Sequence, residues 1–126
     1  MKKVIFTDKA PSPIGPYSQA ILTGNTLYVS GQVALNPQTG DLEMGSIEDQ
    51  THQVMKNLSA VLAAADMNFE NVVKATIFIT DMNNFSRINA VYGSYFPSEY
   101  APARETVQVS ALPRNVDVEI SVIAVR

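Results

Sequence analysis

Residues 46–80, SIEDQTHQVMKNLSAVLAAADMNFENVVKATIFIT, contain the helix and the strand on which the predicted fold depends. Ser46, with Asp49 three residues later, is typical of a capped first helical turn. One stripe at helical spacing then follows, formed by Ile47, Thr51, Val54, Leu58, Val61, Leu62 and Ala65. Residues 72–80 have the valine and isoleucine content of a buried central strand. We therefore expect an amphipathic helix packed on a sheet.

Short strands are expected before this unit, and a second helix and two strands after it. The further predicted strands cover residues 3–6, 18–23, 26–30, 104–109 and 116–125. Gly24 and Asn25 predict a tight turn, and residues 110–115 a longer one. A second helix is expected to start near Asp81, because apolar residues then recur at helical spacing.

This order of elements predicts an α+β fold, in which two helices pack on one face of a mixed sheet of about six strands. The chain has 126 residues, of which 46% are hydrophobic and 17% charged, so residues 1–126 are expected to form a single domain. The uncovered face of the sheet also carries apolar residues, Ile123 and Val125 among them. Burial of such a face usually requires another subunit, which predicts an oligomer with clefts between subunits.

Composition excludes several classes of site. The chain has no cysteine, so disulfides, thiolate nucleophiles and cysteine-ligated metals are excluded, and a single histidine makes a zinc site improbable. That histidine, His52, lies off the apolar stripe and is expected to be a solvated surface residue. The net charge is -3, the pI is about 5.0 and no basic run is present, so nucleic acid is not a favoured partner. Residues 1–6 hold too short an apolar stretch for a signal peptide or membrane span, which predicts a cytoplasmic protein.

Arg104 and Glu119 are the candidate chemical centre. If residues 104–109 and 116–125 pair as an antiparallel hairpin, matching their apolar positions places Thr106 opposite Glu119. Arg104 and Glu119 then become diagonal neighbours, with their Cα atoms roughly 7–8 Å apart. This spacing alone favours an ordinary cross-strand ion pair, worth about 0–1 kcal/mol.

A second interpretation gives the same pair a chemical role. A guanidinium binds a carboxylate through two parallel hydrogen bonds, and an adjacent carboxylate can hold or partly deprotonate a water. Together they suit hydrolysis of a small acid. The rigid turn before Tyr17 and the glycine at the strand end Ser30-Gly31-Gln32 add a phenol and an approachable backbone.

These segments together closely resemble the reactive-intermediate deaminase family, also called RidA or YjgF-like, over nearly the whole chain. The resemblance rests on Ile14-Gly15-Pro16-Tyr17-Ser18-Gln19, Ser30-Gly31-Gln32, Asn36-Pro37 with Thr39-Gly40, Asn89 with Tyr92, Pro102-Ala103-Arg104 and Val118-Glu119-Ile120. It implies a homotrimer of chorismate-mutase-like fold with sites between subunits. It also implies a 2-iminobutanoate/2-iminopropanoate deaminase, which hydrolyses 2-imino acids or their enamines to 2-keto acids and ammonia without a cofactor. Pyridoxal-phosphate enzymes release such reactive intermediates.

The resemblance also implies roles for individual residues. Arg104 would bind the substrate carboxylate and Glu119 would position the attacking water. The pocket would be lined by Tyr17, Ser30, Gly31 and Asn89, with a backbone contact from Thr106. Many relatives have a small residue followed by cysteine after the arginine, where this chain has Glu105 and Thr106. This difference bears on substrate preference.

Two alternatives to imine hydrolysis stay open at this point. The same pocket could serve a non-catalytic, ligand-binding regulatory trimer for small keto acids. A ribonuclease-type translation inhibitor is the other alternative, because RNA cleavage is attributed to some relatives. The acidic pI and the lack of a basic patch disfavour it.

Overall fold

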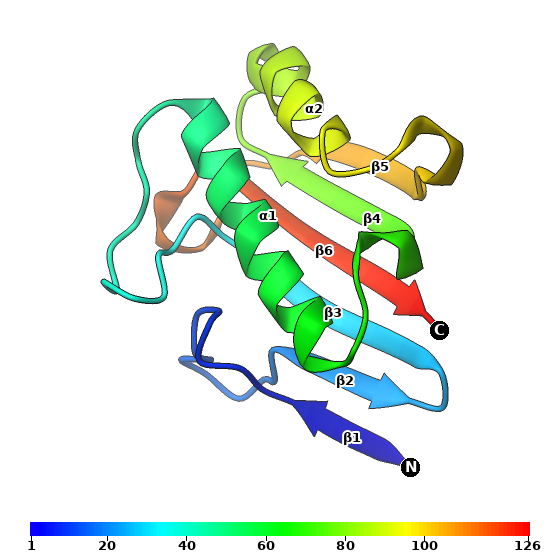
Figure 1. Ribbon diagram of the computed structural model, residues 1–126. Coiled ribbons are helices and arrows are strands. Elements are labelled where there is room, and N and C mark those ends of the chain that lie inside the picture. Colours follow the sequence, from blue (N-terminus) through cyan, green and yellow to red (C-terminus); the bar gives the residue numbers. More distant parts are fainter.

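The computed structural model describes the backbone of residues 1–126 and every side chain except that of Ser98. The described chain forms one mixed sheet of six strands, in the order β1-β2-β3-β6-β4-β5, and both α-helices lie on one face of it (Figure 1). The strands are β1 (Lys2–Ile5), β2 (Ala20–Thr23), β3 (Thr26–Gln32), β4 (Val72–Ile79), β5 (Ala103–Gln108) and β6 (Val118–Val125). The helices are α1 (Ile47–Ala64) and α2 (Phe85–Gly93). The predicted α+β architecture is confirmed.

Helix α1 begins and ends as its sequence predicts. The Ser46 hydroxyl accepts a hydrogen bond from the backbone N–H of Asp49 at 3.1 Å, which satisfies one of the free donors of the first turn. After the cap residue Ala65, Asp66 adopts a left-handed conformation with φ of 58° and stops the helix. The predicted apolar stripe is buried against the sheet.

Strand β4 occupies the position between β5 and β6. It pairs in parallel with β5 and antiparallel with β6, so the hairpin predicted between residues 104–109 and 116–125 is wrong. The physical reason is helix α2, which lies between β4 and β5 in the chain and returns it to the same end of the sheet. Such a crossover connects parallel neighbours.

The two faces of the sheet differ in what covers them. Along β6, Val118, Ile120 and Val122 are buried beneath the helices, whereas the alternate residues Glu119 and Ser121 point to the opposite face. Large apolar side chains on that open face stay exposed in the single chain, for example Tyr28 on β3. A second copy over this face remains a prediction. No α-helix among the described residues has the length and apolar character needed to cross a bilayer.

Candidate functional site

Arg104 lies on the edge strand β5 and points toward helix α2. Its Nη1 donates a hydrogen bond of 2.5 Å to Oδ1 of Asn89. The centre of the guanidinium lies 5.1 Å from the ring centroid of Tyr92 and 5.7 Å from that of Phe85. Since an arginine has five N–H donors in a fixed plane, these contacts set the orientation of the fork and leave donors for a carboxylate.

Tyr92 supplies a neutral, buried ring on which this cation rests. Its burial raises the pKa of the phenol to about 12, although the charge of Arg104 acts in the opposite direction. The phenol therefore stays protonated at physiological pH. Its hydroxyl is buried, and no hydrogen-bond partner for it is found among the described residues. The aromatic face attracts the guanidinium through its quadrupole.

Glu119 belongs to a different part of the molecule. It is half-buried on β6, where it lies against Gly31 at an irregularity in the pairing of β3 with β6 between Val29 and Gln32. A Cβ atom at Gly31 would lie 2.7 Å from Cδ of Glu119, so only glycine allows this close approach. Burial raises the pKa of the Glu119 carboxyl from its ordinary value.

A pocket of about 450 Å³ lies beside Glu119, which forms part of its wall. It brings together four of the residues singled out in the sequence, namely Tyr17, Ser30, Gly31 and Glu119. Most of the remaining wall is apolar and comes from the loop before Tyr17 and the segment after β3. A mostly apolar hollow with a few polar groups is the usual form of a small-molecule site.

Gln19 holds the loop that forms one wall of this pocket. Its side-chain amide donates to the carbonyls of Thr7, Ala10 and Pro11, and its Oε1 accepts from the N–H of Thr7. Gln19 is almost fully buried. The position of Gln19 in the segment 14–19 gives no sign of this anchoring role, because its partners lie eight to twelve residues earlier in the chain.

The structure separates Arg104 from Glu119, which corrects the predicted single-chain pair. Arg104 lies beside Ala75 on the helix-covered face, whereas Glu119 lies beside Phe78 on the open face. Asn89 and Thr106 accompany Arg104, and Thr106 Oγ1 is buried without a partner among the described residues. One chain thus carries two candidate half-sites, an oriented guanidinium at Arg104 and a pocket that contains the Glu119 carboxylate. The reason is again β4, which separates the two strands.

The family model described as endoribonuclease L-PSP matches residues 7–126. The chain belongs to the reactive-intermediate deaminase (RidA/YjgF-like) family. A solved structure from Yersinia pestis, titled as a Rid-family protein of unknown function, is 54% identical, with a TM-score of 0.97 and full coverage of both chains. The 2-iminobutanoate/2-iminopropanoate deaminase of Mus musculus is 48% identical, over 100% of this chain and 93% of the mouse protein. TdcF from E. coli, solved with bound serine, is 41% identical over 98% of each chain, with a TM-score of 0.93.

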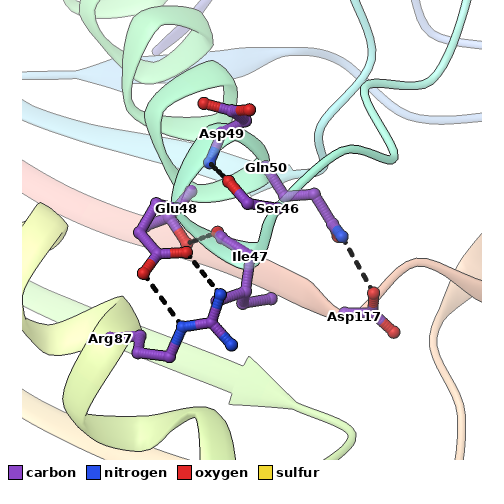
Figure 2. A network of polar contacts seen from close by, with 8 residues as sticks. Ser46, Ile47, Glu48, Asp49, Gln50, Arg87 and Asp117 are labelled. Atoms are coloured by element: carbon purple, nitrogen blue, oxygen red, sulfur yellow. Dashed lines mark hydrogen bonds and ion pairs between the residues drawn. The ribbon is translucent and has the colours of Figure 1, made fainter.

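In this RidA-family chain, polar contacts link the start of α1 to Arg87 on α2 and to Asp117 just before β6 (Figure 2). Glu48 accepts two hydrogen bonds from Arg87, at 2.9 and 2.7 Å, and Arg87 precedes Asn89 by two residues. The hydrogen bonds from Arg87 lower the pKa of Glu48 to about 2. Gln50 donates to Asp117 Oδ2 at 2.9 Å, and Asp117 precedes Glu119 by two residues.

His52 takes no part in either half-site of the RidA-family chain. It is half-buried and its Nδ1 is 2.9 Å from the hydroxyl of Tyr95, so the expectation of a solvated surface histidine is wrong in detail. The reason is that α2 and the turn after it pack Tyr95 beside α1, a contact that the helical stripe does not predict. No cluster of three or more His, Asp or Glu side chains suited to a metal ion occurs in the described part of the chain.

Proposed function

We propose that this protein hydrolyses 2-imino acids, such as 2-iminobutanoate and 2-iminopropanoate, to 2-keto acids and ammonia. The observation that carries the proposal is the presence of two complementary half-sites, an oriented guanidinium at Arg104 and a half-buried carboxylate at Glu119. The mouse relative that bears the name of this activity is similar over the whole chain.

In the proposed reaction, Arg104 binds the substrate carboxylate through two parallel hydrogen bonds and so fixes the imine carbon. Glu119 holds a water and accepts one of its protons while the oxygen attacks that carbon. Because the imine is protonated, its double-bond electrons pass to nitrogen, and the carbon–nitrogen double bond becomes a single bond, which gives a neutral carbinolamine. Glu119 returns the proton to the amine nitrogen. The carbon–nitrogen bond then breaks as ammonia leaves, and the hydroxyl gives its proton to Glu119 as the carbonyl of the keto acid forms. Water is the only co-reactant.

The raised pKa of Glu119 suits this role. A general base works best when its pKa lies near the working pH, and burial moves the carboxyl in that direction. The close contact with Gly31 limits the positions that the carboxylate can take on the side of β3. Held in this way, the water is presented from a fixed direction.

We propose further that a complete site takes Arg104 from one copy of the chain and Glu119 from another, in a homotrimer. Three features support this assembly. The two residues occupy opposite faces of one sheet, β5 ends the sheet order and so has a free edge, and Tyr17 beside the pocket is 52% exposed in the single chain. Closed rings of identical subunits bury such surfaces.

A coupled assay with threonine dehydratase tests the activity. Release of 2-ketobutyrate and ammonia is followed with the wild type, Arg104→Ala and Arg126→Ala. Arg126→Ala is the control for loss of an arginine, because the Arg126 side chain donates to the Ala65 carbonyl. The wild type and the control should accelerate release, and Arg104→Ala should not. Full activity in Arg104→Ala would refute the proposal. Binding of 2-ketobutyrate without any ammonia release would instead favour a regulatory, non-catalytic pocket.

A further inference from the structure

A second arginine reaches the pocket that contains Glu119. Arg114 lies in the short helical turn Pro113–Asn115 that precedes β6, and both Pro113 and Arg114 line the pocket. Glu119 and Arg114 are the charged side chains in this lining. The pocket therefore combines a carboxyl group, a guanidinium and largely apolar walls.

Arg114 differs from the other three arginines in its contacts. Arg87 pairs with Glu48, Arg104 donates to Asn89, and Arg126 donates to the carbonyl of Ala65. For Arg114, neither an ion pair nor a hydrogen-bond acceptor is found among the described residues. Its guanidinium is exposed and available to an anion that enters the pocket.

The backbone at this position adopts a conformation that L-residues seldom occupy. Arg114 has φ of 60° and ψ of 18°, and Asn115 has φ of 57°, so two consecutive residues lie in the left-handed region. Asparagine tolerates this region, whereas a long side chain such as that of arginine is strained there. The turn is held by Pro113 and by the hydrogen bond from Asn115 N–H to the Leu112 carbonyl. The fold thus fixes the point from which the Arg114 side chain extends.

We propose that Arg114 is a specificity-determining residue that widens the substrate class to 2-imino acids whose side chain ends in a second carboxylate. This inference rests on the proposed function. Arg104 binds the carboxylate next to the imine carbon, and Glu119 delivers water to that carbon. The side chain of the substrate therefore extends into the pocket that contains Glu119. The apolar walls suit its methylene groups, and the guanidinium of Arg114 suits the terminal carboxylate.

The test compares two imines and three proteins. D-Alanine oxidised by a D-amino acid oxidase supplies 2-iminopropanoate, and D-glutamate oxidised by a D-aspartate oxidase supplies 2-iminoglutarate. The three proteins are the wild type, Arg114→Gly and Asn115→Gly. Arg114→Gly removes the guanidinium, and glycine suits the left-handed backbone at that position. Asn115→Gly places glycine at the neighbouring left-handed position and keeps the guanidinium. Release of keto acid above the spontaneous rate gives kcat/KM for each pair.

Arg114→Gly should lower kcat/KM for 2-iminoglutarate by about fivefold, as expected for the loss of one partly exposed ion pair. The kcat/KM for 2-iminopropanoate should change by less than about twofold. Asn115→Gly should resemble the wild type. Equal effects on both imines, or no effect on either, would overturn the inference. If the wild type accelerates neither imine, the proposed function fails, and calorimetric binding of 2-oxoglutarate and pyruvate decides the role of Arg114. Weaker binding of 2-oxoglutarate in Arg114→Gly alone would support it, and unchanged binding would overturn it.

Discussion

Replacement of Gly31 by alanine should separate catalysis from stability. The added Cβ would lie 2.7 Å from both Cδ and Oε2 of Glu119 and 2.9 Å from its Cγ. Non-bonded carbon atoms pack at about 3.5–4.0 Å, so the carboxylate must move by about 1 Å. A displacement of that size in a catalytic group costs about 100-fold in rate. The contact involves the end of a flexible, half-exposed side chain, so the free energy of unfolding should fall by less than about 1 kcal/mol.

The assay is keto-acid release from 2-iminobutanoate, together with thermal unfolding followed by circular dichroism. Gly93→Ala is the matched control, because a Cβ at Gly93, at the end of α2, would meet no atom within 4 Å. The control should keep its activity and gain about 0.4–1 kcal/mol of stability from the restricted unfolded chain. Gly31→Ala should unfold near the wild-type temperature and be nearly inactive. Wild-type turnover in a folded Gly31→Ala protein would refute the reasoning that the position of Glu119 matters.

Three further predictions concern residues around the two half-sites. Asn89→Asp places a carboxylate against Arg104, where it competes with the substrate carboxylate for the guanidinium. KM should therefore rise about tenfold with little change in kcat, whereas an unchanged KM would show that the Asn89 contact does not affect binding. Burial raises the pKa of Glu119, so its contribution to stability is complete below the unfolded-state pKa and is lost as pH rises through the folded-state pKa. The melting temperature of Glu119→Gln relative to wild type should therefore increase as the pH rises through the folded-state pKa of Glu119, and a constant difference would contradict the assigned burial. Gln19→Leu breaks four hydrogen bonds to residues 7–11 and should cost about 2–3 kcal/mol in urea unfolding, whereas an unchanged midpoint would exclude the anchoring role.

The helices and strands could be predicted from the sequence because each depends on residues that lie close together in the chain. The Ser46 cap, the stripe of α1 and the buried strand β4 depend on residues that are neighbours in the chain. Each observed strand starts and ends within two residues of its predicted limits. The tight turn at Gly24 is also present, with φ of 57°.

Strand pairing could not be derived in this way. Alternation along β5 and β6 fits a hairpin as well as it fits the observed arrangement, in which β4 separates the two strands. The sequence did contain a signal for the correct pairing. A helical segment between two strands favours parallel neighbours, and α2 between β4 and β5 is such a segment.

The division of the site follows from that pairing. Sequence reasoning selected Arg104, Asn89, Glu119 and Gly31, and the structure brings the first two together and the last two together. Their distribution over two faces depends on non-local contacts, which one sequence does not reveal. The sequence predicts a turn over residues 110–115, but not the left-handed backbone of Arg114, because arginine seldom adopts that conformation.

The central claim is that a complete site takes Arg104 from one chain and Glu119 from another, and subunit mixing tests it most directly. Arg104→Ala and Glu119→Gln, each inactive alone, are unfolded together in equal amounts, refolded and assayed for imine hydrolysis. In a random mixture, about a quarter of the shared sites contain both intact residues, so about a quarter of wild-type activity should return. If mass spectrometry finds mixed oligomers that stay as inactive as the parents, the claim of a shared site is contradicted.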